Sequence, residues 1–119
     1  RAASEIPDRA IEQVEPGRTP DEIFQTALDV ARKLGYGETY LGPPANRVRF
    51  VGHGIGLELV EAPLIAPGRG ERLAPGMTFA LEPKMVFEGE FTAGVESVVA
   101  VTETGHRLIS RVPVEVFYA

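Results

Sequence analysis

The hydrophobic pattern changes its period once along the chain, close to Gly35, and this change constrains the fold more than any other feature. Before it, apolar residues recur every three or four positions, which is the spacing of one face of an α-helix. After Tyr36, glycine and proline interrupt the chain every few residues, and apolar residues alternate with polar ones as in β-strands. The chain is therefore predicted to be α+β, with helices first and strands after them.

Two helices are predicted before this change. The apolar face of the first consists of residues at helical spacing, Ile6, Ala10 and Val14. Pro16-Gly17 ends that pattern, because neither residue easily continues a helix. The second helix begins at Thr19-Pro20-Asp21-Glu22, which combines a capping hydroxyl, a proline at the first helical position and a glutamate three residues after the cap. Gly35 provides the stop, so this helix is predicted to end near Leu34.

Four strands are predicted after the change, at residues 47–52, 77–82, 95–102 and 106–110. The last two are joined by Glu103-Thr104-Gly105, which is typical of a hairpin turn with its glycine at positive φ.

Composition and charge exclude several classes of protein. The 119 residues, 44% of them hydrophobic, suffice for one domain spanning residues 1–119. The net charge is −5 and no basic cluster occurs, so nucleic acid is not an expected partner. No apolar stretch approaches the roughly 20 residues of a membrane helix, and no membrane partner is expected. The absence of cysteine favours a cytoplasmic location, and the start at Arg1 is interpreted as a piece of a longer protein.

His53 lies at the end of an apolar strand, within Phe50-Val51-Gly52-His53-Gly54-Ile55-Gly56. The three glycines permit another backbone to approach closely. Two interpretations remain open: a histidine presented for chemistry, and a core or turn histidine beside a tight bend.

Glu82 ends the strand predicted at residues 77–82, and alternation places it on the same face as Thr78 and Ala80. This face of small residues leaves room beside the carboxylate, which suits a ligand facing a cavity. The alternative is an ordinary glutamate that faces solvent at a strand end.

Glu96 shares a face with Val98 and Ala100 in an otherwise apolar run, so it is expected to be buried and to need a partner. Burying an ionised carboxylate costs several kcal/mol unless a cation, a metal or hydrogen bonds offset it. A bound metal is one solution. The alternative is an exposed edge-strand glutamate that prevents association between sheets.

Four segments of the chain occur in the order seen in pita-bread metallopeptidases: Gly52-His53-Gly54-Ile55-Gly56-Leu57-Glu58-Leu59, residues 73–83, Gly94-Val95-Glu96 and residues 101–105. The chain therefore resembles this family, which includes methionine aminopeptidase, aminopeptidase P, Xaa-Pro dipeptidase (prolidase) and the metal-independent creatinase. The resemblance covers nearly the whole chain but only the C-terminal half of the family's catalytic domain. It implies half of a pita-bread fold, with two helices on one face of a curved, mainly antiparallel sheet.

Carried onto this sequence, the resemblance implies that His53, Glu82 and Glu96 are metal ligands, with Glu96 bridging two divalent ions. His53 and Glu82 would also be catalytic residues, Glu82 lying near the attacking water. The mixed imidazole and carboxylate donors suit manganese or cobalt, with zinc or iron as alternatives. The implied reaction is hydrolysis of an amide bond in a short peptide, including peptides with proline after the first residue.

The sequence departs from the family pattern at two places. The paired aspartates of the family precede the first helix, and the aspartates present here, Asp8, Asp21 and Asp29, are expected on or beside helices. Val60 stands where many members have a second histidine that helps to stabilise the tetrahedral intermediate. Lys84 and Gly94 also differ from residues common in prolidases. The isolated chain is therefore expected to be inactive, and either metal-free or a weak metal binder.

Two alternative functions follow from these departures: a non-catalytic pita-bread module that binds peptides or proteins, and a creatinase-like hydrolase without metal. The expected partners are a short peptide, the N-terminal half of the domain, and further copies of the chain that cover apolar surface. Residues 113–119 are expected to form an apolar docking tail. His106, Glu58 and Glu61 are expected to be solvated.

Overall fold

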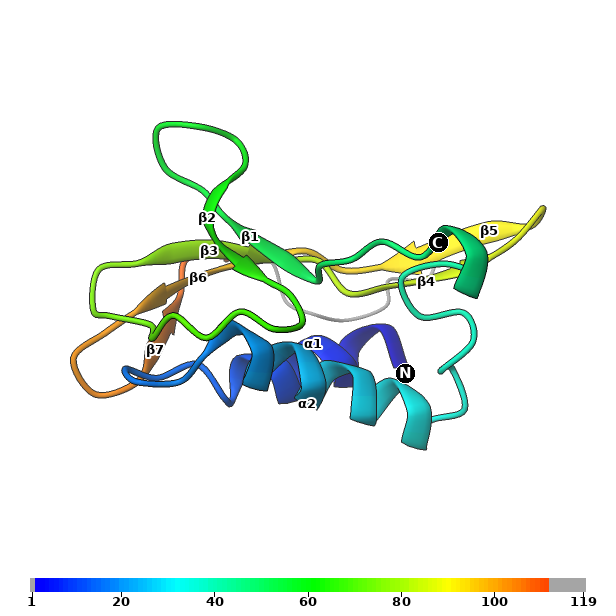
Figure 1. Ribbon diagram of the computed structural model, residues 1–119, viewed down its shortest axis with the longest axis horizontal. Coiled ribbons are helices and arrows are strands. Elements are labelled where there is room, and N and C mark those ends of the chain that lie inside the picture. The colour runs from blue at the N-terminus through cyan, green and yellow to red at the C-terminus, as the bar shows by residue number, and fades with distance from the viewer. Residues whose placement is uncertain (1, 112–119) are drawn as a thin grey trace.

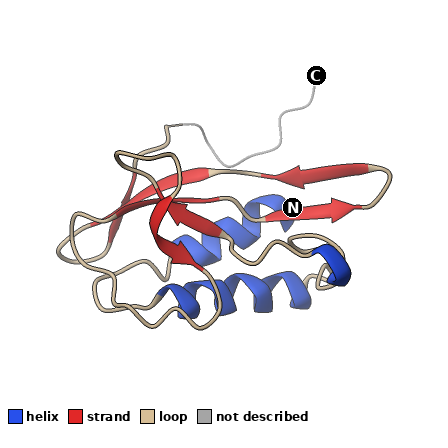
Figure 2. Cartoon of the chain, turned by 45° about the horizontal axis from the view of Figure 1, so that its top comes forward, coloured by secondary structure: helices blue, strands red, loops and turns tan. Residues whose placement is uncertain are grey.

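The computed structural model describes residues 2–111, and the predicted docking tail at residues 113–119 lies outside them. Two helices cover one side of a five-stranded sheet, and a two-stranded hairpin extends beyond its end (Figures 1 and 2). In chain order the elements are α1 (Ala2–Ile11), α2 (Pro20–Lys33), a 3₁₀ helix (Pro44–Asn46), β1 (Gly52–Gly54), β2 (Glu61–Ile65), β3 (Thr78–Leu81), β4 (Lys84–Phe87), β5 (Phe91–Gly94), β6 (Ser97–Val101) and β7 (His106–Leu108).

The predicted start and end of α2 are confirmed. The backbone N–H of Thr19 donates to Glu22 Oε2 at 2.8 Å, and the backbone N–H of Glu22 donates to Thr19 Oγ1 at 3.3 Å, which completes a capping box. Leu34 is the C-cap, and Gly35 follows it with a φ of 85°. Local chemistry therefore sets both ends of this helix.

The first helix ends earlier than its apolar pattern predicts. α1 stops at Ile11, and the backbone hydrogen bonds of Gln13 and Val14 run to the third preceding residue, as in the 2.9 Å bond from the N–H of Val14 to the carbonyl of Ile11. Val14 is buried outside the helix. Its carbonyl lies 3.0 Å from Nδ1 of His106, so this histidine, which is exposed as expected, also ties β7 to the end of the helical layer.

The five-stranded sheet has the order β2-β1-β3-β6-β7, and every neighbouring pair is antiparallel. The predicted strands at residues 77–82, 95–102 and 106–110 correspond to β3, β6 and β7 with shorter bounds. The strand predicted at residues 47–52 is wrong, because only its last residue enters β1. There the side chain of Arg47 donates to the carbonyls of Gly37 and Gly42, so the segment folds back on the preceding turn.

Strands β2, β4 and β5 were not predicted from the sequence. β2 contains Pro63, and a proline is tolerated there because β2 is an edge strand whose outer side needs no partner. The turn at residues 103–105 joins β6 to β7 as expected, and the N–H of Thr102 donates to the carbonyl of Gly105 at 3.0 Å. Gly105 does not adopt the positive φ that was expected of it.

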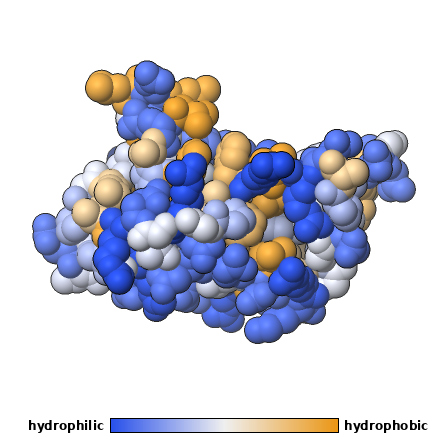
Figure 3. All heavy atoms as spheres, in the orientation of Figure 1, coloured by the Kyte–Doolittle hydropathy of each residue, from blue (hydrophilic) through white to orange (hydrophobic). Residues whose placement is uncertain are grey.

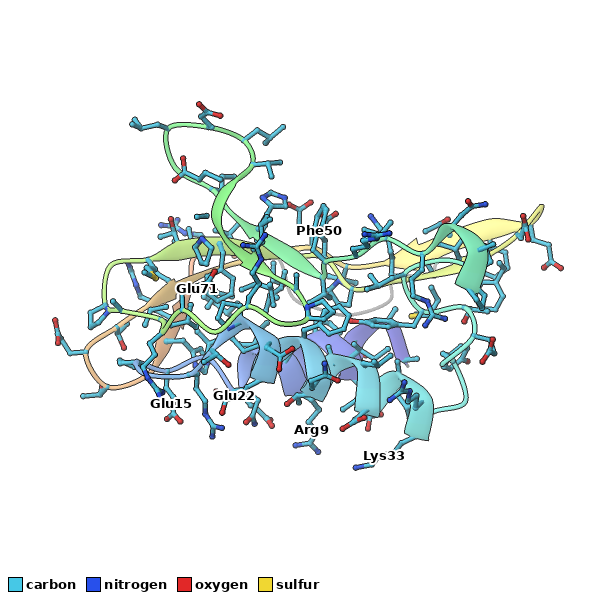
Figure 4. All side chains as sticks on the ribbon, viewed as in Figure 1. Arg9, Glu15, Glu22, Lys33, Phe50 and Glu71 are labelled. Atoms are coloured by element: carbon cyan, nitrogen blue, oxygen red, sulfur yellow. The ribbon has the colours of Figure 1, made fainter. Side chains whose placement is uncertain are left out.

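The core lies between the helices and the sheet. Ile6 of α1, Ile23 of α2 and three strand residues, Phe79, Leu81 and Val99, are fully buried in one cluster. On the opposite side of the helices, Arg9 and Lys33 point away from the sheet (Figure 4). The helical layer therefore covers one face of the sheet.

Neither described helix combines the length and the apolar content that a membrane span requires.

A loop at residues 55–60 joins β1 to β2 and rises clear of the sheet (Figure 1). Its apolar side chains point into solvent, with Leu57 fully exposed and Leu59 76% exposed. The space-filling view shows apolar atoms at the top of this projection (Figure 3). This projecting loop is the part of the described chain where large apolar side chains are most exposed.

Candidate functional site

The candidate site lies on the face of the sheet that the helices do not cover, here called the open face. His53 pairs with Ala80, and Ala80 pairs with Val98, so these residues form one row across three strands. Their neighbours in sequence, such as Phe79 and Val99, belong to the core instead. Strand alternation thus separates the candidate site from the core.

Glu82 and Glu96 belong to the same face. Leu81 pairs with Ser97 in the antiparallel register of β3 and β6, and one further step along that register brings Glu82 opposite Glu96. The contact of Glu82 with His53 and the hollow that Glu82 and Glu96 both line agree with the face predicted for the two glutamates. The N–H of Glu82 donates to the carbonyl of Val51 at 2.8 Å, which fixes this end of β3 against the residues that lead into β1.

The His53 ring contacts the backbone of its own strand, β1. The side chain is buried, and Nδ1 lies 3.0 Å from the carbonyl oxygen of Gly54. Because a carbonyl only accepts hydrogen bonds, Nδ1 is the donor in this contact, and in the neutral tautomer that makes it Nε2 keeps its lone pair. Nε2 lies 3.7 Å from Oε1 of Glu82. An imidazole nitrogen and a carboxylate oxygen, both of them metal-ligand types, therefore lie side by side.

The glycines around His53 make this arrangement possible. A Cβ atom at Gly52 would overlap the carbonyl oxygen of Ala80, and one at Gly54 would overlap that of Ala62. The neighbouring strands approach β1 too closely for any side chain at these positions. The predicted close backbone approach is confirmed.

Glu82 has a second charged neighbour that sequence reasoning missed. Lys84 Nζ lies 3.6 Å from Oε2 of Glu82, and both side chains are partly exposed. A signal was present in the sequence, because two residues separated by one position share a face of an extended chain. The lysine offsets the carboxylate's charge on the side away from His53.

Glu96 differs from its prediction in burial. It is exposed, because it precedes β6 in the link from β5, and therefore its carboxylate needs no partner for reasons of burial. It borders a hollow of about 300 Å³ together with Glu82 and Lys84. The other residues that line this hollow are Pro83, Thr92, Gly94 and Val95. Both predicted carboxylate ligands thus open into one space.

Comparison with known proteins decides the family. The model of metallopeptidase family M24 matches residues 1–103. The chain belongs to this family. It is 37% identical over 106 residues to the probable dipeptidase PepE of Mycobacterium tuberculosis, with 89% of this chain and 26% of that protein covered. It is 34% identical over 103 residues to an Xaa-Pro dipeptidase of Lactobacillus helveticus, with 87% of this chain and 26% of that protein covered.

Solved structures of similar proteins agree with the fold. An X-Pro aminopeptidase from Thermotoga maritima superposes with a TM-score of 0.87 at 29% identity, over 98% of this chain and 31% of that chain. The dipeptidase PepE of Mycobacterium ulcerans gives a TM-score of 0.86 at 34% identity, over 96% of this chain and 29% of that chain. The predicted half of a pita-bread fold is confirmed. The M24 chain described here spans about a quarter of the length of the curated relatives it matches.

The donor atoms fit a metal of the M24 type only in part. An imidazole nitrogen and carboxylate oxygens are suitable ligands for first-row divalent ions. Within residues 2–111, however, no three histidine, cysteine, aspartate or glutamate side chains lie close enough to hold one ion. The expectation that His53, Glu82 and Glu96 converge on a shared ion is therefore not met, although the first two are adjacent.

The aspartates of this M24 chain lie in the helical layer, as expected, and two of them have structural partners there. Asp21 Oδ1 accepts from the N–H of Gly68 at 2.8 Å, and Asp29 pairs with Arg32 at 3.6 Å. Asp8 lies within α1. These carboxylates are therefore on the far side of the sheet from the open face.

The residues after His53 lie in the projecting loop. Val60, at the position of the second histidine of many relatives, is 49% exposed. Glu61 accepts from the N–H of Glu58 at 3.1 Å through Oε2, so one of the two glutamates expected to be merely solvated closes the loop instead.

Proposed function

We propose that this chain forms part of a metal-dependent M24 peptidase that hydrolyses short peptides, including those with proline after the first residue. Family membership supports the class, and the names of the similar dipeptidases and aminopeptidases support the substrate. The observation that carries the proposal is the pair His53 and Glu82, whose donor atoms lie 3.7 Å apart on the open face. The pair is formed by residues 29 positions apart, which only the sheet brings together.

In this proposal His53, Glu82 and Glu96 would be ligands to a pair of divalent ions once residues outside this chain complete the site, with manganese or cobalt preferred to zinc or iron. When bound, such ions supply a Lewis acid that activates water and polarises the peptide carbonyl. His53 contributes a lone pair whose direction is set by the bond from its other nitrogen to Gly54. Glu82 adds a carboxylate that is partly open to solvent, where it can accept a proton from water.

We propose further that a complete site needs residues outside this chain. The described part of the chain brings no three suitable side chains within range of one ion. The second ion of a metal pair would have few ligands here, and an M24 chain of this extent is expected to bind metal weakly and to hydrolyse nothing.

Metal titration with matched variants tests the assignment. Manganese and cobalt are titrated by calorimetry into the parent chain, Glu82→Gln, Glu96→Gln and the control Glu90→Gln, an exposed position outside the hollow. We expect the first two substitutions to weaken binding at least about tenfold, the usual minimum for disturbing a metal ligand, and the control to leave it unchanged. Metal affinity that is insensitive to Glu82→Gln would refute the site.

Hydrolysis of Xaa-Pro dipeptides is measured on the same proteins. Background rates are expected throughout. Turnover by the pure chain that disappears in Glu96→Gln would show that the residues outside this chain are not needed.

A non-catalytic M24 module that binds peptides or proteins is the second candidate. It is favoured by Val60, which cannot stabilise a tetrahedral intermediate and which lies beside the exposed Leu57 and Leu59. The two candidates differ in their need for metal. Peptide binding that is unchanged by a chelator and by Glu82→Gln, but lost when Leu57 and Leu59 become serine, would favour the binding module over the peptidase.

A further inference from the structure

A second hollow, of about 550 Å³, opens where α2, the segment at residues 44–50 and the end of β2 meet. Its lining combines three arginines with apolar side chains, and none of the lining residues is acidic: Phe24, Pro44, Ala45, Arg47, Val48, Arg49, Phe50, Leu64, Ala66, Pro67 and Arg69. Figure 3 shows strongly hydrophilic and apolar side chains next to each other above α2. The hollow shares no residue with the one that Glu82 and Glu96 line.

Within residues 2–111, none of the three arginines forms an ion pair. Arg47 donates to two backbone carbonyls, of Gly37 at 2.8 Å and Gly42 at 3.3 Å, which satisfies hydrogen bonds but leaves its charge without a counterion. Arg49 and Arg69 have no side-chain hydrogen bond or ion pair with any residue of the described chain. A protein with a net charge of −5 thus gathers three cations in one hollow and places no carboxylate among them.

Such a surface favours an anion whose charged group is joined to an apolar body. Guanidinium groups bind carboxylates and phosphates with two parallel hydrogen bonds, which makes unpaired arginines in a concave site strong anion donors. The rest of the lining is apolar, with Phe50 (labelled in Figure 4) and Leu64 among the partly buried residues. The volume falls in the range of about 300–1,000 Å³ that is usual for small-molecule sites.

We propose that this hollow binds a small organic anion, in which a carboxylate or phosphate group sits on an apolar body. Arg49 and Arg69 hold the anionic group, and Phe50 and Leu64 contact the apolar body. Arg47 shapes the hollow, because its bonds to Gly37 and Gly42 fix the segment that forms one wall. This inference does not rest on peptidase activity.

The hollow also adjoins the candidate metal site. Leu64 pairs with His53 in the register of β1 and β2, and the rings of Phe50 and His53 meet edge to face with centroids 6.2 Å apart. A ligand that contacts Phe50 therefore lies one side chain away from His53, and the His53 ring resonances report on its binding.

The test uses the whole chain and N-acetylphenylalanine, which carries a carboxylate and an aromatic body, with its neutral amide as the matched probe. Binding is followed by the amide resonances of residues 48–50 and 64 in NMR titrations. We expect the carboxylate to bind at least about tenfold more tightly than the amide, as removal of a charge-assisted bond predicts. Inorganic phosphate, titrated separately, is expected to bind more weakly than N-acetylphenylalanine because it has no apolar body.

Variants locate the site. Arg49→Gln and Arg69→Gln are each expected to weaken binding of N-acetylphenylalanine at least about fivefold and to leave the thermal unfolding curve unchanged, since neither side chain has a partner in the described chain. The control Arg107→Gln, an exposed arginine on β7, should bind as the parent does. Equal affinity for the acid and its amide, or parental affinity in both hollow variants, would overturn the proposal. Phosphate that binds as tightly as the acid would overturn the role of the apolar body.

Discussion

One face of the five-stranded sheet packs in the core and the other carries the candidate site, although both consist of alternate residues of the same strands. On the helix side, Phe79, Leu81 and Val99 are fully buried in the core. On the open face, His53 lies beside Glu82, which also contacts Lys84 and lines a hollow. A step of one residue along β3 or β6 therefore changes the role of a side chain from folding to chemistry, and substitutions at adjacent positions should have separable effects.

The largest expected effect is on the helix side. Phe79→Ala removes a ring that is completely buried beneath the helices and should lower the free energy of unfolding by about 3–5 kcal/mol. The matched open-face change, Val98→Ala, removes a partly exposed side chain and should cost about 1 kcal/mol or less. Urea denaturation of both variants measures the difference. Equal losses would mean that the open face is as much a core as the other.

A smaller loss of stability is expected at Gly54, the residue that follows His53 in β1. Gly54→Ala introduces a Cβ atom that overlaps the carbonyl of Ala62, so β2 must shift, at a cost of about 1–3 kcal/mol. Gly105→Ala is the control, because nothing lies within 4 Å of its Cβ position and its φ is not positive. Denaturation curves measure the free energy of unfolding of both variants. A neutral Gly54→Ala would show that β2 is not held tightly beside His53.

The projecting loop is a third region to compare with the two faces, because its apolar residues belong to neither of them. The double substitution Leu57→Ser and Leu59→Ser should leave unfolding almost unchanged, within about 0.5 kcal/mol, since both side chains are exposed. The sequence analysis expects copies of the chain to associate through exposed apolar surface; if that surface is this loop, the same change should reduce the apparent mass in light scattering at high concentration. Self-association that persists in the double variant would assign it to another surface.

The smallest expected effect lies on the helical layer, in the capping box of α2. The hydrogen bond from the backbone N–H of Thr19 holds the pKa of Glu22 below its ordinary value of 4.5. A folded-state pKa below the unfolded one adds stability above pH 4.5 that is lost as the pH falls through the lower folded value. Glu22→Gln should therefore lower Tm slightly at neutral pH and not at acid pH. The same variant should not change metal binding, because α2 lies on the other side of the sheet.

The parts of the structure that sequence reasoning predicted correctly depend on neighbours in the chain. The ends of α2 follow from Thr19, Glu22 and Gly35, whose contacts span a few residues. The shared face of Glu82 and Glu96 follows from strand alternation within each run. The family and the half pita-bread fold were predicted instead from the resemblance of four segments, between residues 52 and 105, to pita-bread metallopeptidases, and the M24 match agrees with that prediction.

What only the tertiary structure decided involves residues far apart in the sequence. The apolar spacing predicted a first helix that includes Val14. In the structure, Val14 lies beyond that helix and its carbonyl contacts His106 of β7. Pro63 argued against predicting a strand at β2 from the sequence. The strand forms because β1 pairs with it at the edge of the sheet. The exposure of Glu96 and the gathering of three arginines in one hollow depend on which strands and helices lie beside them. Local hydrogen bonds and alternation can be read from the chain because they act over a few residues, whereas burial and charge grouping depend on how distant segments pack against one another.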